Sequence, residues 1–153
     1  MPNILLPVPH IQQREDADCL AACAAMALAY AGVRIEYPHL LRLLKVKPFG
    51  TPGHNLNYLS TLGVQVTYRE SSMRELVRTV TAGIPCIALV KTAELPYWRY
   101  PVDHAVVTVG IGNHTLFLND PAFPNAPIEV DIEEFELAWM EFDYRLGFVL
   151  KIS

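Results

Sequence analysis

The stretch that decides the fold runs from Gln13 to Gly32 and reads QREDADCLAACAAMALAYAG. Its second half is rich in Ala, Leu and Met, which are strong helix formers, and its final glycine is a natural helix stop. Asp16 and Asp18 precede the apolar run, and acidic residues suit the positive end of a helix dipole. These features predict a buried helix over residues 18–31, with Cys19 in its first turn.

The size and charge of the chain limit its class. Its 153 residues fit one domain, over residues 1–153. Apolar residues make up 52% of the chain and charged residues 18%, a composition typical of a folded core rather than of disorder. The net charge is −4, whereas nucleic-acid-binding proteins usually present a basic face. Nucleic acid and anionic membranes are therefore poor partners for this protein.

The apolar runs of the chain are short. The longest, Leu20–Ala31, has 12 residues, whereas a membrane-spanning helix needs about 20. The first ten residues, MPNILLPVPH, lack the basic start and the long apolar stretch of a secretion signal. An odd number of cysteines, 3, favours free thiols in a reducing compartment. We therefore expect a cytoplasmic protein without an integral membrane segment.

Helical patterns dominate the first half of the chain, and apolar, β-branched runs dominate the second. Beyond the first helix, helices are expected over residues 37–45, 53–62, 72–82 and 132–142. Strands are expected over residues 65–69, 86–90, 105–111, 115–119 and 144–152, with residues 1–12 as an extended lead-in. Helices followed by antiparallel strands predict an α+β fold rather than a doubly wound parallel sheet.

Cys19 is the first candidate for chemistry. The start of a helix favours an anion, and the thiolate is the nucleophilic form of cysteine. Most free cysteines are small buried hydrophobes, however, and the neighbouring acidic residues oppose a thiolate by their charge. Cys23 and Cys86 have apolar neighbours and are predicted to be core residues. No metal site is predicted, because no second matching pair of ligands accompanies the cysteines.

A cysteine nucleophile needs a base, and the base needs an orienting group. His104 begins a predicted strand, and Asp120 ends the strand that follows it. A two-residue turn at Gly112-Asn113 would bring the two within one residue of being opposite each other. A longer loop or one bulge would place them on the same face of the hairpin. The alternative interpretation is that Asp120 only forms a turn.

Two further elements complete the candidate site. Gln13 precedes Cys19 by six residues, and its amide is able to donate to a developing oxyanion, although a lone glutamine carries little information. The loop before the histidine carries three aromatic residues, Tyr97, Trp98 and Tyr100. This loop is interpreted either as a cleft wall that grips an extended peptide substrate or as a cap over the core.

Taken together, these segments resemble a known family. The segment QREDADCLAACAAMALAYAG resembles the opening of bacteriocin-processing cysteine peptidases, papain-like domains that precede many exporters and cleave double-glycine leader peptides. The segments DHAVVTVGI (103–111) and LNDPA (118–122) resemble the second block of that family, a strand that begins with His and is followed by Asn-Asp-Pro. On this resemblance the chain is a stand-alone member without the exporter domains.

The resemblance implies a fold and a mechanism. The fold would be α+β and papain-like, with an N-terminal helical half packed on a C-terminal antiparallel β-sheet. Cys19 would be the nucleophile, His104 the general base, Asp120 the group that orients the base, and Gln13 the oxyanion donor. No metal or organic cofactor would be required. The substrate would be a peptide or protein, with leader peptides as one class, and a separate transporter would be a candidate partner.

One departure from the family pattern leaves alternatives open. The family usually has Gly directly after the nucleophile, whereas this chain has Leu20. The first alternative is a peptide-binding module that keeps the fold without cleaving. The second uses the same residues as a thiol-dependent deamidase or transamidase, because the chemistry is identical up to the thioester. The sequence alone does not separate these three functions.

Overall fold

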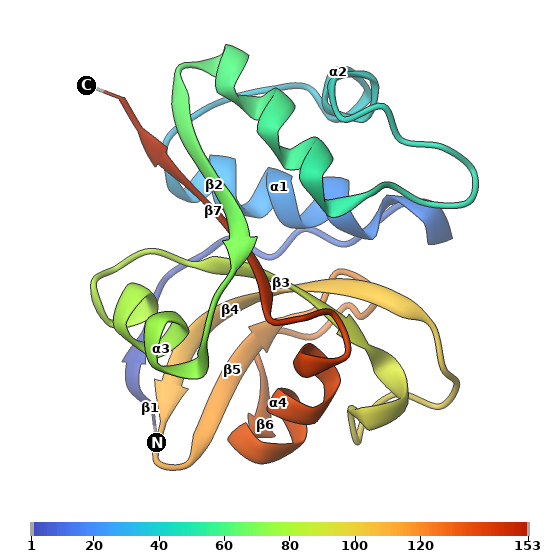
Figure 1. Ribbon diagram of the computed structural model, residues 1–153. Helices are drawn as coiled ribbons and strands as arrows, with labels where there is room; N and C mark the ends of the chain where they lie inside the picture. The colour runs from blue at the N-terminus through green and yellow to red at the C-terminus, as the bar shows by residue number, and fades with distance from the viewer. Residues whose placement is uncertain (1, 153) are drawn as a thin grey trace.

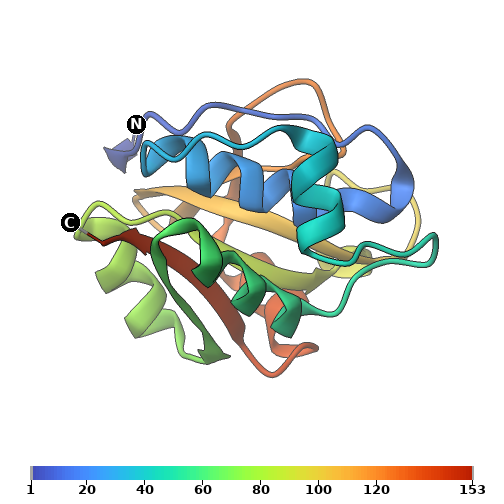
Figure 2. The same ribbon diagram turned by 90° about the horizontal axis from the view of Figure 1, so that it is seen from above.

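A seven-stranded antiparallel sheet runs through the protein, with helices on both of its faces (Figures 1 and 2). The computed structural model describes residues 2–152. The strand order is β2-β7-β3-β4-β5-β6, and β1 pairs with β4 outside this path. The strands are β1 (Pro2–Leu5), β2 (Val64–Glu70), β3 (Cys86–Lys91), β4 (Asp103–Gly112), β5 (Thr115–Asn119), β6 (Ile128–Asp131) and β7 (Arg145–Lys151).

The helices lie on two sides of this sheet. The α-helices are α1 (Cys19–Tyr30), α2 (Tyr37–Leu43), α3 (Met73–Thr81) and α4 (Ile132–Met140). The 3-10 helices are η1 (Asp16–Asp18), η2 (Gly53–Leu62) and η3 (Thr92–Glu94). Figure 2 shows α1 and α2 above the sheet and α3 and α4 below it. Within residues 2–152, none of the helices has the length and apolar character that crossing a membrane requires.

The sequence predicted most of these elements and missed a few. The expected helix at 53–62 is present, but it is the 3-10 helix η2 rather than an α-helix. Its sequence, GHNLNYLSTL, is rich in Gly, Asn, Ser and Thr, which favour local turns over α-helix. The strand β6 was missed, and β1 was expected only as an extended lead-in. Each has four residues, too few to show a clear alternation.

The helix α1 is buried because almost every one of its faces packs against the protein. Among its buried residues, Ala24, Met26 and Leu28 are each 0% exposed. Alternate side chains of β4 face two separate cores. Val107 packs in the core under α1, whereas Val106 packs in the core under α3 and α4. The predicted packing of N-terminal helices on the antiparallel sheet is therefore confirmed, and a second helical layer covers the other face.

The β4–β5 hairpin differs from prediction in its turn. The two strands are joined by Asn113-His114, one residue later than expected, and the register shifts by a bulge between Thr108 and Gly110. His114 has a positive φ of 65°, which Asn and His adopt more readily than most residues. Beyond the bulge, Val107 lies opposite Asn119. Strand alternation then places His104 and Asp120 on the same face.

The segment before α1 is attached to the end of this hairpin. The backbone N–H of Gln13 donates to the carbonyl oxygen of Pro121 at 2.8 Å. The side-chain amide of Asn119 donates to the carbonyl oxygen of Val8 at 3.2 Å. These bonds join the chain leading to Cys19 with the turn that carries Asp120.

Candidate active site

Cys19 is the first residue of α1 and lines a cavity of about 630 Å³. Its side chain is partly exposed, whereas Cys23 and Cys86 are 0% exposed. Burial, followed by the electrostatic interactions with Cys19 and Asp120, raises the pKa of Cys23 well above its ordinary value. Burial also raises the pKa of Cys86 to about 12. Among the three free thiols, only Cys19 combines a helix start with access to a cavity.

The turn before Cys19 is held by a buried carboxylate. Asp18 is 3% exposed, and it accepts a hydrogen bond from the backbone N–H of Glu15 at 2.7 Å. It also accepts bonds from the backbone N–H of Arg14 at 3.3 Å and from the hydroxyl of Tyr37. Of the two acidic residues that the sequence places before Cys19, Asp18 is therefore bonded into its own turn. The other, Asp16, is exposed at the edge of the cavity.

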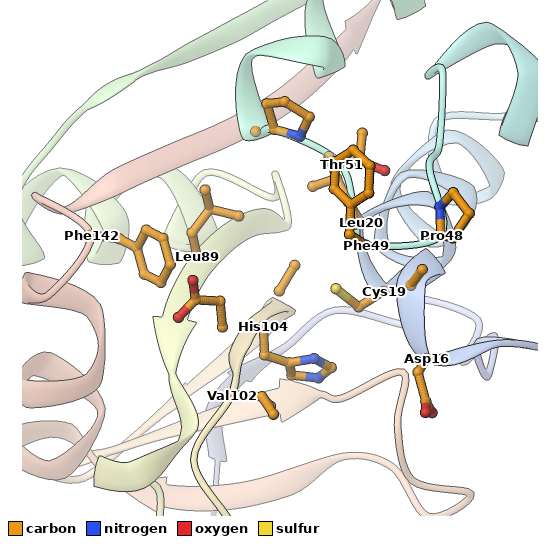
Figure 3. A pocket seen from close by; sticks show the side chains of 16 residues that line it. Asp16, Cys19, Leu20, Pro48, Phe49, Thr51, Leu89, Val102, His104 and Phe142 are labelled. Atoms are coloured by element: carbon orange, nitrogen blue, oxygen red, sulfur yellow. The ribbon is translucent and has the colours of Figure 1, made fainter.

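His104 is the second residue of β4 and lies opposite Val90 of β3. It is 6% exposed, and its Nε2 lies 2.6 Å from Oδ1 of Asp120. Because Nε2 is bonded to Asp120, Nδ1 is the ring nitrogen available to a thiol. Figure 3 shows the Cys19 sulfur and the His104 ring beside each other at the cavity that both residues line. The structure thus brings three of the four predicted residues together.

The electrostatics of His104 favour its protonated form. Burial lowers the pKa of this imidazole, but its hydrogen-bond and charge interactions with Asp120, and those with Cys19, outweigh burial and raise the pKa to about 9. A histidine that keeps its proton at neutral pH is the partner that a thiolate requires. The arrangement can therefore support a thiolate–imidazolium pair.

Asp120 lies just after β5, is 0% exposed, and sits behind His104 rather than in the cavity wall. Its Oδ1 accepts a bond from the backbone N–H of Ala122 at 2.9 Å in addition to His104. Burial raises the pKa of Asp120, but the bonds and charge of His104, with the bonds from Ala122 and Trp98, hold the pKa below its ordinary value. The carboxylate therefore remains charged beside the imidazole.

Gln13 lies in the turn before Cys19 but is not directed into the cavity. Its side-chain N–H group donates to the carbonyl oxygens of Glu15 at 3.0 Å and Asp16 at 3.4 Å. Its Oε1 is buried and has no hydrogen-bond partner. Donation to an oxyanion would require the amide to leave these carbonyls, so its role as an oxyanion donor stays a prediction.

The aromatic residues before His104 have contacts other than those of a cleft wall. The Tyr97 hydroxyl and the Trp98 indole N–H both donate to Oδ2 of Asp120, at 2.7 and 2.9 Å. Tyr100 is 60% exposed, and its ring packs edge-on against Trp98 at 5.5 Å between centroids. None of these three side chains lines the cavity.

Other residues form the cavity walls, and sequence reasoning did not select them. One wall comes from the segment 48–53, in which Phe49 is 89% exposed at the tip of a tight turn. The opposite wall includes Leu89, Val102 and Phe142 (Figure 3). An aromatic residue between Pro48 and Gly50 is the sequence signal from which this turn could have been selected. The residues of the opposite wall come from three distant segments and gave no such signal.

A cysteine at the start of a buried helix, a histidine beside it on an antiparallel sheet, and a carboxylate behind that histidine are the features of a papain-like domain. The particular family follows from the sequence: the pattern of the Peptidase C39-like family matches residues 5–146. The chain belongs to that family. No curated protein sequence matches the chain.

Solved structures of similar fold agree with this assignment. A protein from Bacillus anthracis described as a C39-like peptidase has a TM-score of 0.84 at 20% identity, covering 98% of both chains. A double-glycine motif protease from an AMS/PCAT transporter, in complex with the leader peptide, has a TM-score of 0.75 at 23% identity, covering 96% of this chain and 94% of that one. The peptidase domain of Streptococcus ComA, a bifunctional ABC transporter of a quorum-sensing pathway, has a TM-score of 0.74 at 20% identity, covering 93% and 97%. The likeness establishes the fold.

Proposed function

We propose that this protein is a cysteine peptidase that hydrolyses peptide bonds through Cys19, His104 and Asp120. One observation carries the proposal: Cys19 and His104 line the same cavity, and Asp120 holds the imidazole from behind at 2.6 Å. A nucleophile, a base and an orienting group in this order are the parts that thiol acyl transfer requires. Membership of the C39-like family supports the same activity.

The chemistry follows from the order of contacts. Nδ1 of His104 takes the proton of Cys19, and the thiolate attacks the carbonyl carbon of the substrate peptide bond. The tetrahedral intermediate collapses when His104 returns this proton to the leaving amine, which leaves a thioester on Cys19. Water, deprotonated by His104, then hydrolyses the thioester and restores the thiol. Asp120 keeps the imidazole in one tautomer throughout.

The oxyanion is stabilised by the backbone N–H of Cys19 and, after its amide turns toward the cavity, by Gln13. The bonds that hold Gln13 are to two carbonyl oxygens of its own turn, at 3.0 and 3.4 Å. An oxyanion is a stronger acceptor than a neutral carbonyl oxygen, so it favours this rotation.

A peptide is the substrate that best fits the cavity. Its walls are largely apolar, with Phe49 on one side and Phe142 on the other. The similar AMS/PCAT protease was crystallised with the leader peptide, which supports a leader peptide as the substrate class and a transporter as a partner. We also place the protein in the cytoplasm, where its three free thiols would stay reduced.

Alkylation of Cys19 tests the proposal without a known substrate. The probe is iodoacetamide at pH 6, with the modified cysteine identified by mass spectrometry. Only the thiolate reacts with this reagent, and His104 would stabilise the Cys19 thiolate only in the folded protein. We therefore expect Cys19 to react about tenfold faster in the folded protein than in the chain unfolded in urea. His104→Ala should abolish the difference, whereas His39→Ala, which removes an exposed histidine of α2, should keep it.

The same variants are then tested for cleavage of a peptide mixture that includes double-glycine leader peptides. Cys19→Ala should abolish cleavage while the protein keeps its melting temperature. New peptide termini would support a peptidase, and loss of ammonia without chain cleavage would indicate a deamidase or transamidase instead. Equal rates of Cys19 alkylation in the folded and unfolded chains would contradict the proposal that the fold activates this thiol.

A further inference from the structure

We propose that Tyr97 and Trp98 are positioning residues that fix the Asp120 carboxylate behind His104, and that they do not form a wall for substrate. The inference rests on the proposed function, because it assigns a means of support to the same Cys19–His104 pair. It also replaces the interpretation of this loop as a peptide-binding surface.

The hydrogen bonds of Asp120 divide between its two oxygens. Oδ1 accepts from His104 and from the backbone N–H of Ala122, at 2.6 and 2.9 Å. Oδ2 accepts from Tyr97 and Trp98, at 2.7 and 2.9 Å. With two donors on each oxygen, rotation of the carboxylate would break bonds on both. Tyr97 and Trp98 therefore fix the direction in which Oδ1 faces the imidazole.

Burial makes this arrangement necessary. Asp120 is 0% exposed, so no water replaces a donor that is lost from Oδ2. A buried carboxylate with an unpaired oxygen either takes up a proton or reorients, and both outcomes weaken its bond to His104. Burial and the Asp120 charge raise the pKa of Tyr97, so its phenol keeps its proton and donates it.

The loop that carries the two donors is itself fixed. Thr92 is 0% exposed, and its hydroxyl accepts from the backbone N–H of Val102 at 2.8 Å, which closes the base of the loop. Leu95 is 2% exposed and anchors the loop in the core. The Trp98 ring also packs edge-on against the His104 ring, at 4.8 Å between centroids. The loop thus contacts both the carboxylate and the imidazole.

A third aromatic side chain joins this loop to the turn that follows Asp120. The Phe123 ring packs edge-on against both Tyr97 and Trp98, each at 5.3 Å between centroids. Its backbone carbonyl oxygen lies 2.7 Å from Nε2 of His10, in the segment that leads to Cys19. The Asp120 turn is therefore held between the aromatic loop and the N-terminal segment.

Iodoacetamide separates positioning from substrate binding, because this small reagent does not need a peptide-binding wall. Its reaction with Cys19 is measured from pH 5 to pH 9 in Tyr97→Phe, in Trp98→Phe and in the double variant. The matched control is Tyr144→Phe, which removes a phenol bonded to the carboxylate of Glu136 at 3.1 Å, outside the site. Titration of His104 by NMR in the same proteins gives a direct second measurement.

We expect the double variant to alkylate about tenfold more slowly at pH 7 than the native protein, because two hydrogen bonds to a charged group are lost. The titration midpoint of His104 should fall, and each single variant should show part of both effects. Tyr144→Phe should leave both measurements unchanged. A purely structural contribution would lower the melting temperature without moving the midpoint of His104.

Unchanged alkylation and an unchanged His104 midpoint in the folded double variant would overturn the positioning role. If the double variant does not fold, the single variant Tyr97→Phe, which loses only a hydroxyl group, decides the same question. Failure of the proposed function gives a different result. In that case Cys19 of the native protein would already react no faster than in the unfolded chain.

Discussion

Two buried carboxylates lie at the two ends of the candidate site, and each accepts a bond from a tyrosine. Asp18 is 3% exposed and is bonded to Tyr37, whereas Asp120 is 0% exposed and is bonded to Tyr97. Both also accept bonds from backbone N–H groups of their own turns. By burial and by donor type the two residues are close to equivalent.

The two carboxylates differ in one respect: Asp120 is bonded to a histidine, a residue type whose charge ordinarily changes near neutral pH, and Asp18 is not. Asp120 lies 2.6 Å from His104. Among the hydrogen bonds and ion pairs of the described residues, Asp18 has no titratable partner apart from the phenol of Tyr37. The carboxylate of Asp18 therefore fixes the backbone before Cys19, and that of Asp120 sets the proton affinity of an imidazole. Burial and hydrogen bonding alone do not distinguish the carboxylate that we propose to act through His104 from the structural carboxylate, but the neighbouring imidazole does.

The largest expected effect separates these two residues directly. Asp120→Asn should slow alkylation of Cys19 by iodoacetamide at pH 7 by about 100-fold, because the charge that holds the proton on His104 is lost. The loss of rate should be smaller than the loss that the same Asp→Asn substitution causes in a Ser-His-Asp triad. The asparagine carbonyl oxygen can still accept a hydrogen bond from Nε2 of His104. Asp120→Asn should also lower the free energy of unfolding, because His104 loses its charged partner and the asparagine N–H group would face the indole N–H of Trp98.

Asp18→Asn should lower stability without slowing alkylation. An asparagine N–H group would face the backbone N–H of Arg14 or Glu15, so we expect a loss of about 2 kcal/mol in the free energy of unfolding. Urea unfolding measures this loss, and alkylation of the folded variant should change by less than threefold. If Asp18→Asn slows alkylation as much as Asp120→Asn does, the division between the two carboxylates is wrong.

The second effect is a pH dependence that only the Asp120 end should show. The pKa of His104 is raised to about 9 in the folded protein, above its ordinary value of about 6.5. Its contribution to stability is therefore fully present below about pH 6.5 and is lost as the pH rises through about 9. We expect this contribution to be on the order of 3 kcal/mol.

Urea unfolding at pH 6 and at pH 10, for the native protein and for His104→Gln, measures this contribution. The stability advantage of the native protein over the variant should shrink between the two pH values. In the Asp18→Asn background the same shrinkage should persist, because Asp18 does not contact His104. A constant advantage across this range would show that His104 does not hold its proton in the folded state.

Most of the fold was predictable because its signals are local. The helix α1 was expected over 18–31 and spans Cys19–Tyr30. Its limits are local features of the sequence, namely the run rich in Ala, Leu and Met and the glycine that follows it. The bulge between Thr108 and Gly110 was not predictable, because it depends on packing between strands. The short strand β6 was missed for the same reason: its position depends on pairing with β5.

The sequence predicted the residues of the candidate site better than it predicted the side chains that hold them in place by hydrogen bonds. Cys19, His104 and Asp120 carry reactive groups in a recognisable order. The positions of Tyr97 and Trp98 could not be derived, because an aromatic loop can face solvent, core or cleft with the same sequence. The bond of Tyr37 to Asp18 was also hidden, since it joins α2 to a turn 19 residues earlier. Such contacts depend on how distant elements pack.

The smallest effect tests the comparison through its tyrosines. Tyr37→Phe removes one donor from Asp18 and should lower the free energy of unfolding by about 1–2 kcal/mol, since a buried charged acceptor loses a partner. The His104 midpoint should stay unchanged, in contrast to Tyr97→Phe, because Tyr37 has no bond to Asp120. Tyr58→Phe is the control: among the described residues its phenol is bonded to Lys45 alone, at 3.3 Å, and Tyr58 is 40% exposed, so the loss of stability should be near zero. If Tyr37→Phe moves the His104 midpoint as far as Tyr97→Phe, the turn before Cys19 and the turn after β5 act as one electrostatic unit, because Gln13 bonds to Pro121 across them.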